Sequence, residues 1–327
     1  MVDVPSTLFG GRSPAEFLSE FWQKKPILVR GALPGFQSPI SPEELAGLAL
    51  EEEVSSRIVQ PEGGAYPWQL RYGPFEAEEI EELPEAGWSL LVQEVDQWHS
   101  EAARVLDYFR FIPNWRIDDL MISYATPGGG VGAHIDNYDV FLIQGMGRRR
   151  WEIGLDPVYD EVLVPDIDVR VLADFSPDAE WILEPGDMLY LPPRIPHNGV
   201  ALDACMTLSV GFRAPSQSEL IGGFMGYLAQ TMDPTARYAD PDLQPTSDPG
   251  LLPLEVVESL RRSLLAHVDD AEAFRSWFGC HVTEPKRGSY AVPPDEPWER
   301  ETLLKALEDG GEMVRRSLGQ FVHIDHP

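Results

Sequence analysis

The sequence predicts a mainly β domain with flanking helices, followed by a mostly helical C-terminal region. From about residue 117 to residue 213, short apolar runs recur between turn residues, which is typical of an antiparallel barrel or sandwich. Beyond Pro215 the apolar residues recur at helical spacing instead. With 327 residues, 43% of them hydrophobic, the chain can bury a sizeable core in one large domain or in two to three smaller ones.

Two helices and a strand are predicted before the β region. Ser13 and Ser41 each precede a proline and have a glutamate three positions later, so each is expected to start a helix with a capping box. The segment "KPILVRGAL" predicts a buried strand that ends at Gly31. Short strands and turns are expected over residues 52–75, and an apolar stripe predicts a helix over residues 93–110.

Six apolar runs make up the predicted β region, and turn residues bound each of them. They cover residues 118–127, 138–147, 148–155, 159–165, 181–193 and 205–215. Helices are then predicted over residues 218–232, 254–268 and 298–311, with a loop rich in proline and aspartate over residues 233–250.

The charge of the chain is strongly negative, with 54 acidic residues against 25 basic ones and a net charge of −29. Such a surface repels phosphates, so direct binding of nucleic acid is not expected and a basic partner is favoured. Solubility, or adaptation to salt or heat, explains the acidity equally well.

Membrane and secreted classes are also disfavoured. No apolar run reaches the roughly 18 residues that a membrane span needs, and the N-terminal residues do not resemble a secretory signal. Two cysteines, Cys205 and Cys280, do not form a disulfide framework. A cytoplasmic, reducing location is therefore expected.

The stretch "GGGVGAHIDNYDVF" places His134 and Asp136 two positions apart at the expected start of a strand, so that both side chains point to one face. His197 follows a second strand, in the turn "PRIPH". Two histidines and one carboxylate form the facial triad that binds non-haem Fe(II) and leaves coordination positions open. The preceding glycines would let the chain bend and leave space beside the metal, although taken alone they also fit an ordinary flexible loop.

Three consecutive arginines enter the strand that follows. Alternation places Arg149 on the inward face with Trp151, and Arg148 and Arg150 on the outward face. An inward arginine needs an anion, either a bound dicarboxylate or a structural carboxylate of the chain. Ser123 could add a hydroxyl to the same ligand, or could bond only to the backbone.

These residues resemble the JmjC-type ribosomal oxygenases, which are Fe(II)- and 2-oxoglutarate-dependent protein hydroxylases of the cupin superfamily. The resemblance covers residues 21–33, 127–154, 185–199 and 209–215. It implies a double-stranded β-helix, the JmjC cupin barrel, with flanking helices as the catalytic domain. It also implies that His134, Asp136 and His197 bind Fe(II), that Arg149 binds the distal carboxylate of 2-oxoglutarate with help from Ser123, and that O2 is the second co-substrate.

The resemblance also implies three regions. They are a catalytic domain over residues 1–215, a helical dimerisation region over residues 216–275, and a partial winged-helix-like domain over residues 276–327. A homodimer is therefore expected.

The family resemblance is closest to the bacterial branch, which hydroxylates an arginine of the large-subunit ribosomal protein L-sixteen. Succinate and CO2 would be the co-products, and an acidic rim would attract the basic substrate. The residues themselves leave other functions open. These are hydroxylation of histidine or demethylation of lysine by the same chemistry, a cupin enzyme without a co-substrate, and a non-catalytic cupin-like binding module.

Overall fold

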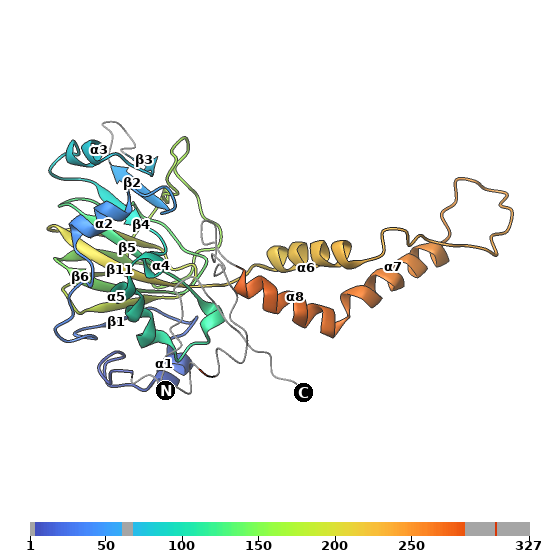
Figure 1. Cartoon of the computed structure of the whole chain (residues 1–327), viewed down its shortest axis with the longest axis horizontal. Coiled ribbons are helices and arrows are strands. Elements are labelled where there is room, and N and C mark those ends of the chain that lie inside the picture. The colour runs from blue at the N-terminus through green and yellow to red at the C-terminus, as the bar shows by residue number, and fades with distance from the viewer. Residues whose placement is uncertain (1–3, 61–67, 285–304, 306–327) are drawn as a thin grey trace. The chain divides into compact units, whose positions relative to one another are not determined.

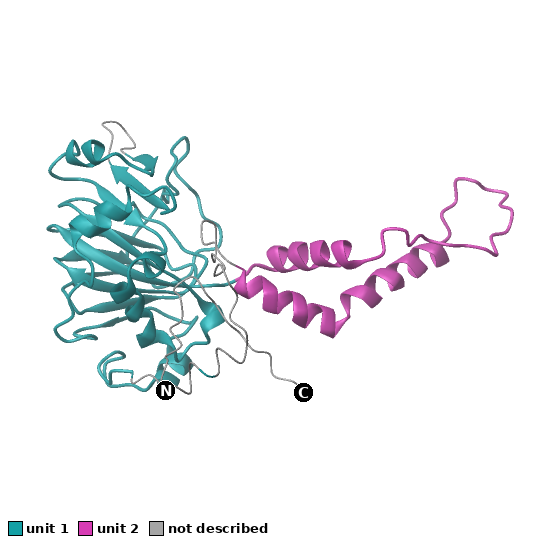
Figure 2. Ribbon diagram, in the orientation of Figure 1, with its two compact units in different colours: residues 1–214, 286–319 teal, residues 215–285, 320–327 magenta. Residues whose placement is uncertain are grey.

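The computed structural model describes residues 4–60 and 68–284, together with Lys305. These residues form two compact units, which divide between Ala214 and Pro215 (Figure 2). The helix predicted over residues 298–311 lies outside the described residues, apart from Lys305. Within the described part of the chain, no helix combines the length and the apolar character that a membrane crossing requires.

The first unit is built on two antiparallel sheets (Figure 1). Across the larger sheet the strands run β1 (Ile27–Val29), β9 (Met188–Leu191), β6 (Val140–Met146), β11 (Cys205–Phe212), β5 (Ile117–Ala125), β4 (Ser89–Val92), β2 (Ser56–Gln60) and β3 (Gln69–Tyr72). Across the smaller sheet they run β10 (His197–Ala201), β7 (Arg149–Ile153) and β8 (Ala179–Leu183). The prediction of a mainly β domain is confirmed, and the crossed strand order is that of a jelly roll rather than of a simple meander.

Short helices accompany the larger sheet. They are α1 (Pro14–Glu20), α2 (Pro42–Leu48), α3 (Ala77–Glu81), α4 (Val95–Trp98), α5 (Ser100–Ala103) and two 3-10 helices, η1 (Arg104–Phe109) and η2 (Asn114–Arg116). The two predicted capping boxes are confirmed, with Ser13 and Ser41 each accepting the backbone N–H of the glutamate three positions later.

The single helix predicted over residues 93–110 is wrong. His99 has an extended backbone, and its ring Nδ1 accepts the backbone N–H of Ala102, so His99 ends α4 and begins α5. The apolar stripe was nevertheless a correct indication of burial, because Val95, Ala102 and Leu106 all lie in the core.

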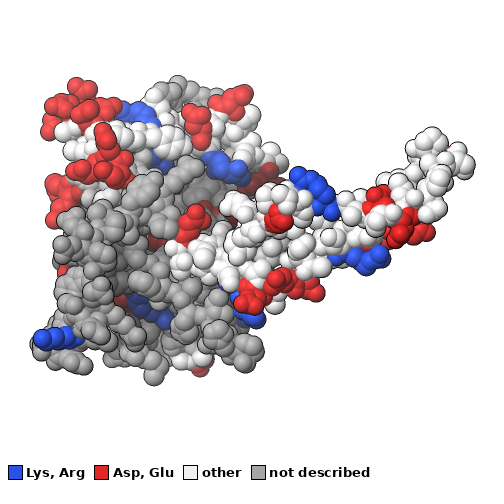
Figure 3. All heavy atoms as spheres, turned by 45° about the vertical axis from the view of Figure 1, so that its right-hand side comes forward, with Lys and Arg blue, Asp and Glu red and all other residues white. Residues whose placement is uncertain are grey.

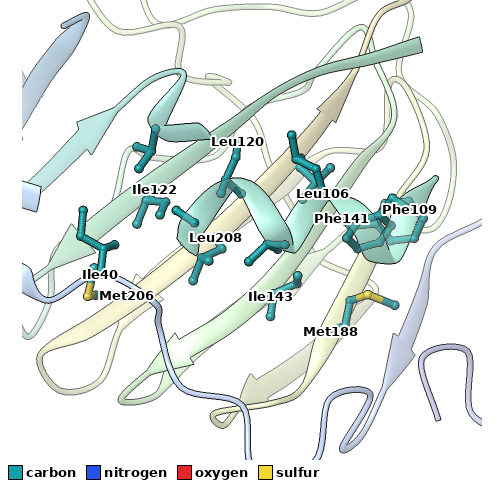
Figure 4. Packing of buried hydrophobic residues seen from close by; sticks show 14 of the residues in the cluster. Ile40, Leu106, Phe109, Leu120, Ile122, Phe141, Ile143, Met188, Met206 and Leu208 are labelled. Atoms are coloured by element: carbon teal, nitrogen blue, oxygen red, sulfur yellow. The ribbon is translucent and has the colours of Figure 1, made fainter. Parts of the chain in front are cut away.

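Alternation along the strands gives the larger sheet two different faces. On the outer face, apolar side chains pack against η1 and the N-terminal segments (Figure 4). The outer-face residues labelled there are Leu120, Ile122, Phe141, Ile143, Met188, Met206 and Leu208. The intervening residues face the smaller sheet and line a cavity; they include Met121, Ser123, Val140, Leu142, Thr207 and Ser209. Both faces of β6 and β11 are therefore buried, and the polar residues Thr207 and Ser209 lie on the face toward the cavity.

The strand predicted over residues 159–165 is also wrong. This segment belongs to a long connection between β7 and β8, where the only ladder contact among the described residues is an isolated bridge between Leu163 and Leu172. Tyr159 and Val162 are exposed. Their apolar pattern resembled a strand, but the pairing stops at this one bridge, which consists of two bonds: the Val164 N–H donates to the Val171 carbonyl and the Ala173 N–H to the Val162 carbonyl.

The second unit contains α6 (Gln217–Thr231), α7 (Leu254–Val268) and α8 (Ala271–Thr283), so the two helices predicted here within the described residues are confirmed. Phe224 and Leu228 of α6 pack against Trp277 of α8 in a small core. By contrast, α7 contains no buried residue, and most of its apolar side chains are exposed in the isolated chain.

Candidate metal and co-substrate site

Three predicted ligands converge at one point of the first unit. One ligand atom from each of His134, Asp136 and His197 lies within 4.8 Å of the other two. Nε2 of His197 lies 3.7 Å from Oδ2 of Asp136, and the two imidazole centroids are 4.2 Å apart. Two nitrogens and one carboxylate oxygen at this spacing form a set that can hold a divalent transition metal.

The backbone fixes the orientation of both imidazoles. Nδ1 of His134 lies 2.9 Å from the carbonyl oxygen of Gly132, and Nδ1 of His197 lies 2.9 Å from that of Ile195. Because a carbonyl can only accept, each Nδ1 carries the proton, and the lone pair is left on Nε2, where a metal would bind. Burial lowers the pKa of His197 to about 4, so its imidazole is neutral at physiological pH.

The expectation that His134 and Asp136 begin a strand is wrong in detail. β6 begins only at Val140, and His134 makes a single antiparallel bridge with His197, through two reciprocal N–H···O bonds of 2.9 Å. Asp136 lies in an irregular segment between this bridge and β6. The side chains of His134 and His197 converge because these main-chain bonds join the segments that carry them. Strand alternation does not explain the position of Asp136.

The glycines before His134 allow close backbone approach. A Cβ at Gly130 would come within 2.5 Å of the carbonyl oxygen of Gly199. Gly132 has a φ of +82°, and a Cβ there would meet Val171 at 2.8 Å. Both positions therefore require glycine. The left-handed backbone of Gly132 agrees with the predicted bend, and Gly130 brings this segment against β10, beside the metal ligands.

Arg149 points inward, as strand alternation predicted. The residue is only 5% exposed, whereas the side chain of Arg148 is 52% exposed and pairs with Asp203. Nη1 of Arg149 donates to the hydroxyl oxygens of Ser123 and Thr207, each at 3.2 Å, and its buried Nε has no partner. No described carboxylate forms an ion pair with it, so the alternative of a structural salt bridge is not seen, and burial lowers its pKa.

A row of polar residues across the larger sheet supports Arg149. Ser123 of β5 is paired directly with Thr207 of β11, which pairs in turn with Gln144 of β6. The Thr207 hydroxyl donates to Oε1 of Gln144 at 3.2 Å and accepts from Arg149, so its orientation is fixed. Ser123 was predicted, but Thr207 and Gln144 were missed, because only the pairing of distant strands places them here.

The triad and Arg149 line the same cavity, which has a volume of about 380 Å³. This size suits a small organic ligand with room for part of a second one. A metal fits the donor set at one part of the wall, and a carboxylate fits the guanidinium of Arg149, whose Nε has no partner, at another.

Comparison with known proteins gives the family. A family model described as a JmjC domain matches residues 104–220, and one described as a ROXA-like winged helix matches residues 264–323. The chain is 44% identical over 301 residues to the ribosomal protein uL16 3-hydroxylase of Escherichia coli (strain K12), an alignment that covers 92% of this chain and 79% of the relative. The chain belongs to the JmjC-domain ribosomal oxygenases.

Other ribosomal oxygenases show the same similarity. A probable ribosomal oxygenase of Haemophilus influenzae is 35% identical over 308 residues, which cover 91% of this chain and 75% of that relative. The X-ray structure of YcfD from Escherichia coli superposes with a TM-score of 0.83 at 42% identity, covering 91% of this chain and 79% of that one. A structure of YcfD in complex with cobalt and 2-oxoglutarate gives a TM-score of 0.78 at 42% identity, covering 90% and 77%.

In this ribosomal oxygenase, the cavity is also lined by polar residues that the sequence analysis did not identify. Asp119 of β5 is 9% exposed, and one of its carboxylate oxygens accepts the backbone N–H of Glu94 at 3.1 Å. Tyr138 lies between Asp136 and β6 and also lines the cavity, although the residue is 41% exposed. Alternation along β5 could have identified Asp119 as an inward residue, because it shares the parity of Ser123.

Proposed function

We propose that this ribosomal oxygenase is an Fe(II)- and 2-oxoglutarate-dependent protein hydroxylase that acts on an arginine side chain of a large-subunit ribosomal protein. The observation that carries the proposal is the buried, unpartnered Nε of Arg149, in a cavity that also contains a His–Asp–His cluster. A buried cation without a carboxylate from the described chain is costly unless a ligand supplies one.

Each residue has a defined part in this proposal. His134, Asp136 and His197 hold Fe(II) through two neutral imidazoles and one carboxylate. Arg149 binds the distal carboxylate of 2-oxoglutarate, while Ser123 and Thr207 hold the guanidinium in place. With O2, the metal supplies the oxidative decarboxylation of 2-oxoglutarate to succinate and CO2, coupled to hydroxylation of the target.

An arginine target suits the wall of the cavity. Asp119 places a carboxylate there, and a guanidinium can bind a carboxylate through parallel N–H···O bonds. The relative from Escherichia coli is named a hydroxylase of ribosomal protein uL16, which supports a ribosomal substrate for this chain as well.

The surroundings of the cavity favour a basic protein. The connection between β7 and β8 contributes Asp168 and Arg170 to the lining, and residues 156–180 contain eight acidic residues against one basic residue. On another side, β2 and β3 line the cavity, and α3 with its flanking residues adds an acidic cluster; Figure 3 shows acidic side chains at the end of the unit where these elements lie. Negative potential of this kind raises the encounter rate with a positively charged partner.

A homodimer that acts in the cytoplasm completes the proposal. Val257, Leu260, Leu264 and Val268 of α7 recur at helical spacing and are all exposed in the isolated chain. An apolar helix face of this kind normally packs against another protein surface. The predicted division into residues 1–215, 216–275 and 276–327 remains part of this proposal.

Succinate release would test the proposed function. The full-length protein is incubated with Fe(II), 2-oxoglutarate and a basic ribosomal-protein peptide that contains one arginine, and the peptide mass is followed. Peptide-stimulated succinate release with a gain of about 16 Da on arginine is expected in the wild type, and loss of both in Arg149→Met. Arg148→Met is the matched control, because that arginine is exposed and lies outside the cavity lining.

Each result decides a separate part of the proposal. Succinate release without any peptide product would keep the chemistry and reject the substrate. A gain of mass on histidine, or loss of about 14 Da from methyl-lysine, would identify one of the alternative targets. No succinate under any condition would reject the enzyme and favour a binding module.

A further inference from the structure

We propose that Arg194 is a positioning residue that joins the long connection between β7 and β8 to the segments that carry the metal ligands. This inference rests on the proposed function, since it concerns the same metal site. Arg194 would fix the positions of Asp136 and His197 relative to each other. It would also hold the connection between β7 and β8, which forms one wall of the cavity.

The backbone of Arg194 contacts one ligand and leads to another. Its N–H donates to the carbonyl oxygen of Asp136 at 2.7 Å. Three positions later in the same turn lies His197, whose ring is oriented by the carbonyl of Ile195. Arg194 therefore provides a second main-chain connection between Asp136 and His197, in addition to the bridge between His134 and His197.

The conformation of this turn is unusual. Arg194 has a φ of +71°, in the left-handed region that residues with a side chain rarely adopt. A glycine would take this conformation without strain. An arginine at such a position is explained if its side chain makes interactions that glycine could not.

The side chain makes these interactions, and all are directed to the segments on either side of the turn. Nε donates to the carbonyl of Val158 at 2.7 Å, and Nη2 to that of Tyr159 at 3.3 Å. Nη1 donates to the amide oxygen of Asn137, next to Asp136, at 2.8 Å. In return the N–H of Val158 donates to the carbonyl of Arg194 at 2.9 Å, so the contact is reciprocal.

The connection held in this way reaches the other side of the metal site. The N–H of Leu172 donates to the carbonyl of Ala133 at 2.7 Å, directly before His134, and Val171 packs against Gly132. Between these attachment points, residues 168–170 line the cavity. The connection is thus fixed at one end by Arg194 and at the other beside His134, and it spans the ligand cluster.

The shape of arginine is essential to this role. A planar guanidinium can donate in three directions at once from one rigid group, whereas a lysine ammonium on a flexible stem cannot reproduce the three partners in fixed geometry. The side chain is 16% exposed, and Glu161 lies 3.9 Å away as a fourth, weaker partner. We therefore expect lysine to keep the charge and to lose most of the positioning.

Metal binding by the metal-free full-length protein tests this role directly. Co(II) is titrated into wild type, Arg194→Gly and Arg194→Lys, and the dissociation constant and the visible d–d spectrum are recorded. Arg194→Gly keeps the N–H that bonds to Asp136 and relieves the strained backbone, so it isolates the side chain. We expect Co(II) to bind about 10- to 100-fold more weakly in both variants, with a changed spectrum, as for other groups that orient metal ligands.

Arg30→Ala is the matched control. Arg30 also donates to a main-chain carbonyl, that of Ile182, and to a carboxylate, Asp187, but it lies beside the start of β9, away from the ligand cluster. Its replacement is expected to lower the melting temperature and to leave the Co(II) dissociation constant unchanged. If Arg194→Gly does not fold, the Co(II) titration of Arg194→Lys alone still tests the positioning role.

The possible results separate the two proposals. Unchanged Co(II) affinity and spectrum in the Arg194 variants would overturn the positioning role and leave the proposed function intact. Equal weakening in Arg30→Ala would also overturn it, because general destabilisation would then explain the effect. Absence of Co(II) binding by the wild type would reject the metal site itself, and the positioning role with it.

Discussion

Nη1 of Arg149, the first residue of β7, lies 3.2 Å from the hydroxyl oxygen of Thr207, near the start of β11. This contact joins the smaller sheet to the larger one inside the cavity. It also uses a full positive charge where neutral hydrogen bonds would have been enough to join the sheets. The position of Arg149 is therefore explained by the ligand that it would bind.

Replacing Arg149 by methionine should stabilise the ligand-free protein. The guanidinium is buried without a carboxylate from the described residues, and exchange of such a charge for an apolar side chain of similar length stabilises by about 1 kcal/mol or more. Urea unfolding without metal or 2-oxoglutarate measures the change. Arg148→Met, at an exposed ion pair, should change stability by less than about 0.5 kcal/mol. A less stable Arg149→Met would contradict the explanation.

Replacing Thr207 by valine should weaken 2-oxoglutarate binding. The change keeps the shape of the side chain and removes the hydroxyl that fixes Arg149. A hydrogen bond to a charged group contributes about 1.5 kcal/mol, so KM for 2-oxoglutarate should rise roughly tenfold with little change in kcat. Thr126→Val removes another buried hydroxyl, one bonded to the backbone of Trp88 outside the cavity lining. Equal KM changes in the two variants would argue against the role of Thr207.

The metal-free protein should lose stability as the pH falls from about 6.5 to about 4. Burial lowers the pKa of His197 from its ordinary value of 6.5 to about 4, so the unfolded chain takes up a proton in this range while the folded chain does not. The loss approaches about 3 kcal/mol at the acidic end. Unfolding free energies of wild type and His197→Asn, measured between pH 4 and pH 8, should differ in this range. Parallel profiles would show that His197 does not cause the effect.

Salt should reduce the capture of a basic peptide. The acidic residues around the cavity act through long-range attraction, which ions screen. Raising NaCl from 50 to 500 mM should lower kcat/KM for such a peptide by about 3- to 10-fold and leave kcat nearly constant. A peptide with its flanking lysines and arginines replaced by glutamine should respond less. Salt-independent kcat/KM for the basic peptide would show that the acidity serves solubility alone.

Charged residues on the apolar face of α7 should separate the proposed dimer. Introducing Leu260→Asp and Leu264→Asp together would place two charges on the surface that we expect a second copy to cover. Light scattering coupled to size exclusion should then give the mass of a monomer. Arg262→Asp changes the charge of the same helix away from this face and should stay dimeric. A monomeric wild type would reject the dimer.

Local chemistry explains what could be predicted from the sequence. Capping boxes at Ser13 and Ser41 depend on residues three positions apart, and the inward direction of Arg149 depends on alternation within one strand. The ligand types of a facial triad grouped His134, Asp136 and His197, and the family resemblance supported this grouping. These predictions needed no knowledge of which strands are neighbours.

The wrong or missing predictions concern features that depend on which segments pair in the folded protein. Residues 159–165 have the apolar pattern of a strand but meet no partner strand, and His99 interrupts a helix whose stripe looked continuous. Thr207 and Gln144 gain their place beside Arg149 only because β11 lies between β5 and β6. No pattern within a single segment contains that information.

The reciprocal main-chain bridge between His134 and His197 has a consequence for the order of folding. The two residues are about sixty positions apart, and β6, β7, β8 and β9 all lie between them in the chain. Contacts of such separation form late, after the entropy of closing the intervening loops has been lost. Metal can therefore bind only once both sheets have assembled, so it cannot nucleate them. Added metal would slow unfolding and leave the rate of folding almost unchanged. Metal uptake during refolding would therefore indicate that both sheets have assembled.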